Sequence, residues 1–273
     1  MKFALNYSPQ AAELIRSGQI PLDYYKCPNW PDLIDVASAQ LPVYVHFDLK
    51  VGAGFDDSVD WAAIERLAAQ TRTPYINHHI APLAKHFPNV PPDVTDRAAA
   101  ERIFHQIMRD ADLIAAKFGP ERVIAENAPY YAGDGDIMRP AALPEVINYV
   151  VEKTGCGFLL DISHARISAR TLGIDERDYL SMLPVHRLRE LHVTGLRLLD
   201  GQLRDHLALT DEDWAMFEWV LDRIRHGQWA APWIVAFEYG GVGPIFEWRS
   251  DPAVIAEQVP RLYDLVHAVP VFP

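Results

Sequence analysis

Two short apolar segments of the chain each carry side chains that bind metals. The segment 157–162 contains Asp161 and is followed by His164, and the segment 188–194 contains His192. A carboxylate or an imidazole in an apolar strand is costly to desolvate unless it is paired or bound to a cation. Two successive strands that both carry such groups therefore predict a shared site, and these residue types favour metal chemistry there.

Residues of the same types occur at the ends of the other apolar segments. The predicted ligands are His46, His79, Glu126, Asp161, His164, His192, Asp205, His206 and Glu238. His78 competes with His79, and Asn127 is a second candidate for a ligand or for a residue that supports one. Nine candidates exceed the three or four protein ligands of one catalytic metal, so the sequence predicts two or three ions bridged by carboxylates. Imidazole and carboxylate ligands without thiolates suit iron, manganese or zinc.

The elements that would position these residues alternate along the chain between short apolar strands and segments of helical spacing. The expected strands are 3–7, 22–27, 42–48, 74–80, 122–127, 157–162, 188–194 and 233–239. The expected helices are 11–17, 31–40, 58–70, 95–118, 143–153, 176–183, 211–226 and 254–268, with Ser58, Thr95 and Thr210 as N-caps. Asp205 and His206 fall in a predicted loop after the strand 188–194.

Eight nearly continuous apolar strands separated by helices are typical of a parallel barrel that is buried on both faces. We therefore expect one (β/α)8 TIM-barrel domain over residues 1–273. An open doubly wound sheet is the alternative, but no GxGxxG turn follows the first expected strand. In a barrel the carboxyl ends of all strands meet at one face, which would bring the predicted ligands together.

Composition narrows the class of protein further. The formal net charge of -12 disfavours a general binder of nucleic-acid backbones. The two cysteines, Cys27 and Cys156, form neither a disulfide framework nor a CxxC zinc pattern, which indicates a reducing compartment, and we expect Cys27 to be buried and inert. The N-terminal segment is too short for a signal peptide, and no apolar run reaches membrane-spanning length. We expect a cytoplasmic protein without membrane contact.

Four motifs carry a resemblance to a known family. ENAPYY from Glu126, TGCGFLLDISHARISA, LRELHVTG and VAFEYGG resemble the multinuclear non-haem iron-dependent oxidative enzymes, the family of the methanobactin-biosynthesis iron protein. The resemblance runs from His46 to the last strand and is strongest from Glu126 to Gly195. It implies a xylose isomerase-like TIM barrel with two or three irons, which often remodels a cysteine of a ribosomally made peptide with O2 and a partner protein.

The same resemblance implies a ligand set and two departures from the family pattern. The implied iron ligands are His46, His79, Glu126, Asp161, His192, His206 and Glu238. The family's Asp-x-Asn-Asn is replaced here by Asp161-Ile-Ser163-His164, and its Asp-x-His is replaced by the adjacent pair Asp205-His206. These departures also resemble the trinuclear zinc site of endonuclease IV. A metal-dependent hydrolase or sugar isomerase is therefore the alternative function, and a non-catalytic metal-binding barrel is the second alternative.

Candidate substrate contacts lie just beyond the strands. Arg166 and Arg197 are expected to lie on a helix or loop surface, with binding of a substrate carboxylate or phosphate as the alternative, and Tyr130 and Tyr239 are expected to border the site. A barrel uses about 250 residues, which leaves little chain for a peptide-gripping domain. We therefore expect a second protein, or a second copy of the chain, to present a peptide substrate near the loop 128–140.

Overall fold

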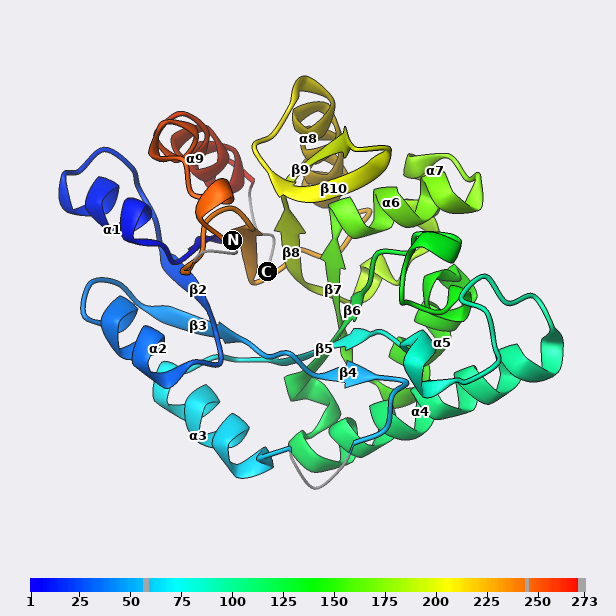
Figure 1. Ribbon diagram of the computed structural model, residues 1–273. Helices are drawn as coiled ribbons and strands as arrows, with labels where there is room; N and C mark the ends of the chain where they lie inside the picture. The colour runs from blue at the N-terminus through cyan, green and yellow to red at the C-terminus, as the bar shows by residue number, and fades with distance from the viewer. Residues whose placement is uncertain (56–58, 244–245, 270–273) are drawn as a thin grey trace. The chain divides into compact units, whose positions relative to one another are not determined.

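The computed structural model describes residues 1–55, 59–243 and 246–269. The chain forms two compact units. Figure 1 labels many of their helices and strands. Unit 1 comprises Met1–His46, Leu67–Thr73 and Arg189–Pro273, and unit 2 comprises Phe47–Arg66 and Pro74–Leu188. Among the described residues, no helix is both long enough and apolar enough to cross a membrane.

Unit 1 is built on parallel strands whose side chains are mostly buried. The strands are β1 (Lys2–Asn6), β2 (Tyr24–Pro28), β3 (Val43–His46), β8 (Leu188–Val193) and β11 (Ile234–Phe237), in the order β3-β2-β1-β11-β8. Pro28 pairs with His46, and Ala236 pairs with His192. Glu238 directly follows β11, so His46, His192 and Glu238 lie at or near the carboxyl ends of β3, β8 and β11.

The helices of unit 1 begin at residues with capping chemistry, with one exception. They are α1 (Pro9–Arg16), α2 (Pro31–Ser38), α8 (Asp211–Arg225) and α9 (Pro252–His267), with the 3-10 turn η6 (Glu247–Arg249). The predicted cap Thr210 is confirmed, and it forms a capping box with Asp213 at the start of α8. Trp30 stands at the N-cap of α2 without any side-chain capping bond. α9 packs against α1 and β1.

Sequence analysis missed an antiparallel hairpin in unit 1. β9 (Gly195–Leu199) and β10 (Gln202–Leu207) pair where a loop was expected, so Asp205 and His206 lie in a strand. The connecting residues Asp200 and Gly201 both adopt positive φ, 50° and 81°. An Asp-Gly pair between two strands is a strong hairpin signal because such turns require positive φ at both central residues.

Unit 2 holds the other parallel strands, β4 (Lys50–Val51), β5 (Ile76–Ile80), β6 (Val123–Asn127) and β7 (Gly157–Asp161), in the order β7-β6-β5-β4. Its helices are α3 (Trp61–Thr71, whose last turn groups with unit 1), α4 (Arg97–Phe118), α5 (Pro144–Thr154), α6 (Ile162–Leu172) and α7 (Glu176–Met182). Five 3-10 turns join them: η1 (Ala84–His86), η2 (Pro120–Arg122), η3 (Ala132–Asp134), η4 (Arg139–Ala142) and η5 (Val185–Arg187).

Three sequence predictions in unit 2 concern one strand end and two helix N-caps. The strand expected at 157–162 ends at Asp161, which caps the unpredicted helix α6, so His164 lies in a helical first turn. The predicted cap Thr95 is wrong, because Asp96 accepts the capping bond of α4. Ser58 lies outside the described residues, and the carboxylate of Asp60 accepts a hydrogen bond from the backbone N of Ala63 at the start of α3.

Candidate metal centre

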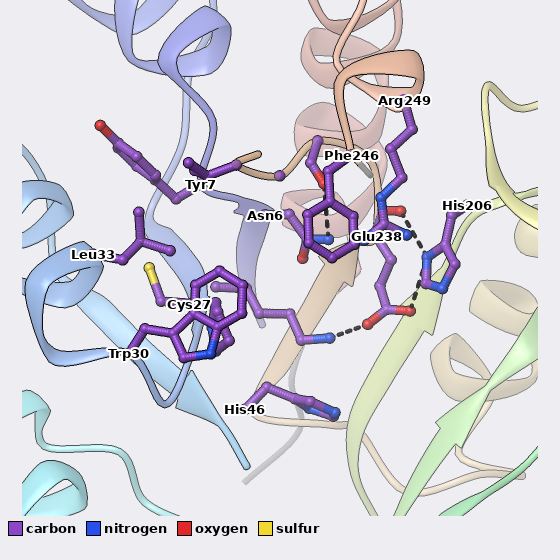
Figure 2. Close-up of a pocket in the computed structure, with 15 residues that line it drawn as sticks. Asn6, Tyr7, Cys27, Trp30, Leu33, His46, His206, Glu238, Phe246 and Arg249 are labelled. Atoms are coloured by element: carbon purple, nitrogen blue, oxygen red, sulfur yellow. Dashed lines mark hydrogen bonds and ion pairs between the residues drawn. The ribbon is translucent and has the colours of Figure 1, made fainter. Parts of the chain in front are cut away.

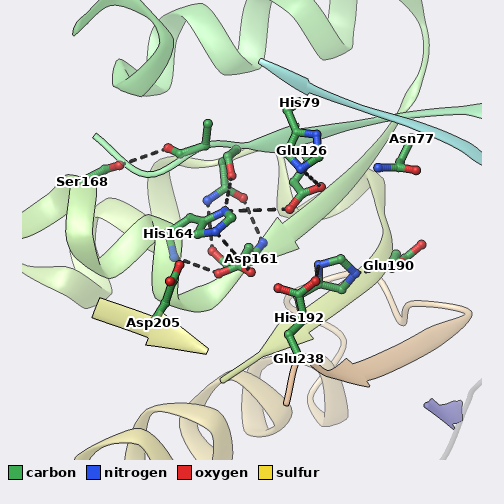
Figure 3. Close-up of polar contacts among 12 residues, drawn as sticks. Asn77, His79, Glu126, Asp161, His164, Ser168, Glu190, His192, Asp205 and Glu238 are labelled. Atoms are coloured by element: carbon green, nitrogen blue, oxygen red, sulfur yellow. Dashed lines mark hydrogen bonds and ion pairs between the residues drawn. The ribbon is translucent and has the colours of Figure 1, made fainter. Parts of the chain in front are cut away.

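Three buried ligand-type side chains converge within unit 2 (Figure 3). Glu126 of β6, Asp161 at the end of β7 and His164 of α6 each offer one ligand atom, and these atoms lie within 4.8 Å of one another. Glu126 is 1% exposed and Asp161 is 0% exposed. The Nε2 atom of His79 lies 3.1 Å from a carboxylate oxygen of Glu126. Two buried carboxylates beside two imidazoles form a donor set that suits a transition metal.

Asn127 fixes the backbone that carries this group. Its side-chain Nδ2 donates to the carbonyl oxygen of Asp161 and its Oδ1 accepts from the backbone N of Asp161, both at 2.9 Å. The Nδ1 atom of His164 lies 3.0 Å from the carbonyl oxygen of Asn127. A carbonyl can only accept, so Nδ1 is the donor and Nε2 is left to bind a metal. These contacts favour a positioning role for Asn127.

The choice between His78 and His79 follows from strand alternation. His79 pairs with Glu126 across β5 and β6 and faces its carboxylate, whereas the side chain of His78 points to the opposite face. His78 is 1% exposed, and neither ring nitrogen has a hydrogen-bond partner among the described residues. Burial, with a smaller contribution from His79, lowers the pKa of His78 to about 3. His78 is therefore a neutral core residue, and the geometry favours His79.

A second group of ligand-type side chains surrounds Glu238 within unit 1 (Figure 2). The Nδ1 atom of His192 lies 3.3 Å from one carboxylate oxygen of Glu238, and the Nδ1 atom of His206 lies 3.6 Å from the other. The rings of His46 and His192 have centroids 5.3 Å apart. His192 and Glu238 are buried, and His46 and His206 are half-buried. The structure thus brings four predicted ligands of unit 1 together.

A β-bulge positions the pair Asp205-His206. The register of β10 shifts between Arg204 and Leu207, and His206 adopts a φ of 58°. Bulges re-aim the side chains of a strand. The Nδ1 atom of His206 lies 3.2 Å from the carbonyl oxygen of Glu238, and a carboxylate oxygen of Asp205 lies 3.8 Å from Nε2 of His206. This local geometry lets adjacent residues serve one site, which strand alternation alone would forbid.

Glu190 is a functional candidate that sequence reasoning missed. It lies two residues before His192 on β8 and is 3% exposed, and its carboxylate oxygen is 2.7 Å from Nε2 of His192. A carboxylate behind a histidine fixes the tautomer and raises the basicity of the other ring nitrogen. The sequence contains a signal for this contact, because Glu190 and His192 are two residues apart and such residues share one face of a strand.

Lys26 of β2 was also missed. Its ammonium forms an ion pair with Glu238, and Lys26 is 5% exposed. Burial by itself raises the pKa of Glu238, but the Lys26 ammonium and then His192, His206 and His46 hold that pKa well below its ordinary value. A lysine inside the apolar strand sequence YYKCP was the available signal.

The predicted substrate contacts fall into two kinds. The expected surface position of Arg166 is wrong, because Arg166 is buried in α6 and its Nε donates to a carboxylate oxygen of Glu176 at 2.7 Å. Tyr130 and Tyr239 are also buried. Arg197 is exposed on β9 and donates to a backbone carbonyl. Arg197 is therefore the accessible one of the four.

Both cysteines are buried and should be unreactive in the native protein. Burial raises the pKa of Cys27 to about 12 and also raises that of Cys156, so both remain thiols at neutral pH. We expect no labelling of the native protein by a thiol-specific chromogenic reagent at pH 8, and labelling of both thiols after unfolding in urea. Fast labelling of the native protein that disappears in Cys27→Ser would contradict this expectation.

Comparison with known proteins assigns the family. The family pattern described as the RiPP precursor modification enzyme MbnB/TglH/ChrH matches residues 26–231, well over half of the chain. The chain belongs to this family. This membership confirms the resemblance seen in the motifs.

Similar proteins agree with this assignment and with the fold. A UPF0276 protein of Caulobacter vibrioides is 30% identical to this chain, and the match covers 59% of this chain and 57% of that protein's length. A UPF0276 protein of Acaryochloris marina is 25% identical over 78% of the chain and 72% of that protein. A D-tagatose 3-epimerase-like protein aligns over 98% of both chains with a TM-score of 0.58 and 14% identity. A D-psicose 3-epimerase aligns with a TM-score of 0.55 and 12% identity over 98% of this chain and 99% of its own. These likenesses confirm the predicted xylose isomerase-like TIM-barrel fold.

Proposed function

We propose that this protein is a multinuclear iron enzyme that uses O2 to oxidise a cysteine-type residue of a ribosomally made peptide. Family membership supports the peptide substrate. The observation that supports a metal is that three of the candidate histidines, His164, His192 and His206, each use one ring nitrogen in a hydrogen bond and so leave the other for a metal. His164 and His206 use Nδ1 to bond backbone carbonyl oxygens, and His192 uses Nε2 to bond Glu190. Such outer partners are typical of metal-ligating histidines, because they fix the tautomer.

The donor set also fits the proposed metal. Unit 2 offers His79, Glu126, Asp161 and His164, and unit 1 offers His46, His192, Asp205, His206 and Glu238. All are imidazoles or carboxylates, which suit iron and, as alternatives, manganese or zinc. Bound iron would supply one-electron oxidation and O2 activation.

The residues of the chain would prepare this chemistry in three ways. Lys26 keeps Glu238 ionised, since its ammonium lowers the pKa of that carboxyl. Glu190 orients His192 and leaves its Nδ1 as the ligand atom. Asn127 fixes the backbone of Asp161. These contacts hold ligand atoms in place before any metal binds, which limits reorganisation on binding.

The first test is metal content and oxygen use. We expect protein purified without oxygen or chelators to carry two or three iron ions per chain. A cysteine-containing precursor peptide should then change mass while O2 is consumed. Only trace metal in folded protein, with no uptake on reconstitution, would rule out the metal centre. Hydrolysis of an abasic-site duplex by the zinc form without O2 would favour the hydrolase alternative, since zinc activates water.

We also propose that a second protein presents the peptide near the loop 128–140 and that the complex works in the reducing cytoplasm. The backbone N atoms of Met138 and Arg139 donate to the carbonyl oxygens of Pro82 and Pro92, which ties the loop to the segment 81–94 within unit 2. A fixed loop is a suitable docking element because it adds no ordering cost. Full peptide turnover by the isolated monomer, unchanged by a protein encoded beside it, would contradict this role. Sedimentation would detect a second copy of the chain in its place.

A further inference from the structure

Unit 1 contains a cavity with an apolar end and a charged end (Figure 2). Its volume is about 600 Å³, a figure that includes space open to solvent. The charged end includes His46, His206 and Glu238, three of the proposed metal ligands. The apolar wall is formed by Tyr7, Cys27, Trp30, Leu33, Val242 and Phe246. The cavity therefore continues from the proposed metal ligands into an apolar recess.

Trp30 is the least expected residue of this wall. It occupies the N-cap of α2, where serine, threonine, aspartate or asparagine would satisfy the free backbone N–H groups, and it makes no capping bond. It is also 47% exposed, although a tryptophan gains most from burial. Neither helix capping nor core packing accounts for an exposed indole at this position. Trp30 lines the cavity, so its exposed face is available to a ligand there.

Arg249 supplies a polar anchor in the same cavity. Its guanidinium packs 4.3 Å from the ring centroid of Phe246, and its Nε is buried without a hydrogen-bond partner among the described residues. A buried donor that is left unpaired is costly, and a bound acceptor would remove that cost. Burial lowers the pKa of Arg249, with Glu238 and Asp205 opposing the shift. Arg249 lines the cavity, so a shift of its side chain would let this Nε–H group donate to an oxygen of a bound ligand.

Gly241 explains how Phe246 closes one side of the recess. A Cβ atom added at Gly241 would lie 2.6 Å from the Cβ atom of Phe246, closer than real side chains approach. Only glycine leaves room for the ring to pack over this turn. Gly241 therefore permits the close approach of Phe246 that forms this part of the apolar wall.

We propose that this cavity binds a large apolar side chain of the peptide, next to the residue that is modified, while Arg249 Nε donates to a peptide carbonyl oxygen. This inference rests on the proposed function and narrows the substrate to peptides with an aromatic or large aliphatic residue beside the modified position. Adjacent residues of an extended peptide lie at most about 3.3–3.6 Å apart along the chain. The modified residue can therefore face the charged end of the cavity while its neighbour faces Trp30.

Two synthetic probes test the proposal, acetyl-Ala-Phe-Cys-Ala-amide and acetyl-Ala-Ala-Cys-Ala-amide. Their dissociation constants are measured on the iron-loaded protein without O2. We expect the phenylalanine probe to bind wild type at least about tenfold more tightly, the effect of burying one aromatic side chain. Trp30→Ala should reduce the ratio of the two dissociation constants to less than about threefold. Arg249→Lys, which keeps the charge but removes Nε, should weaken both probes by a similar factor.

The matched control is Trp248→Ala, because Trp248 is also exposed, at 56%, and does not line the cavity. It should keep the wild-type ratio. Equal binding of the two probes by wild type, including no binding of either, would overturn the proposal, and so would an unchanged ratio in Trp30→Ala. Failure of the proposed oxidation has a different signature. The ratio would persist, but the cysteine of the bound probe would stay unmodified after O2 is admitted.

Discussion

Glu126→Gln is expected to lose most of the bound metal while the chain remains folded. The carboxylate of Glu126 lies beside His79, Asp161 and His164, so it is the shared member of the unit 2 group. Loss of an outer partner of a ligand typically lowers metal affinity by about 10–100-fold, and we expect loss of a ligand charge to exceed that range. The fold should survive, because the amide keeps the shape of the side chain and removes a buried charge. Elemental analysis and circular dichroism measure the two effects.

The corresponding variant in unit 1 is His192→Ala, which removes the imidazole between Glu190 and Glu238. Matched controls are Glu121→Gln and His186→Ala, because both residues are exposed and lie away from the two groups. The controls should retain the full metal content. If Glu126→Gln and His192→Ala also retain it, the ligand assignment is wrong.

Sequence periodicity predicted the parallel strands of both units except β4, which pairs with β5, but it did not predict the segments that finish the site. Asp161 and His164 were assigned to a strand end because the apolar run 157–162 is continuous there. The chain turns into α6 at that point, since the Asp161 carboxylate accepts from the backbone N of His164. An aspartate three residues before a histidine fits both a strand end and the N-cap of a helix. Only the hydrogen bond from the backbone N of His164 to the Asp161 carboxylate identifies the N-cap. The hairpin of β9 and β10 was predictable from Asp200-Gly201, whereas its bulge at His206 was not.

Most ligand candidates were identifiable from their types and places, but their supporting contacts were not. Lys26 and Glu238 are 212 residues apart in the chain, and no local pattern connects them. Glu190 was overlooked because a charged residue near a strand start is ordinarily read as solvent-exposed. Burial decides such cases, and burial depends on packing between distant segments. Sequence alone therefore predicts the candidate metal ligands better than it predicts the residues that hold those ligands in place.

Lys26→Met is expected to be the most destabilising single substitution at the candidate site in metal-free protein. The side chains of Lys26 and Glu238 are only 5% and 8% exposed, so methionine would leave the Glu238 carboxylate buried without its ammonium partner. Breaking a buried ion pair in this way costs about 3–5 kcal/mol. That is a large share of the roughly 5–15 kcal/mol that stabilises a typical domain. Urea unfolding at pH 7 with chelator measures the loss as a lower midpoint.

The double variant Lys26→Met/Glu238→Gln separates charge compensation from packing. It removes both charges, so it should regain most of the stability lost by Lys26→Met and show an interaction energy of at least about 2 kcal/mol in a double-mutant cycle. Lys50→Met is the control, because the Lys50–Asp48 pair is 39% and 69% exposed and such pairs contribute at most about 1 kcal/mol. A Lys26→Met loss no greater than that of Lys50→Met would show that Glu238 does not depend on Lys26. Methionine keeps most of the apolar stem of lysine, so a large loss that the second substitution rescues can only come from the carboxylate left without its partner.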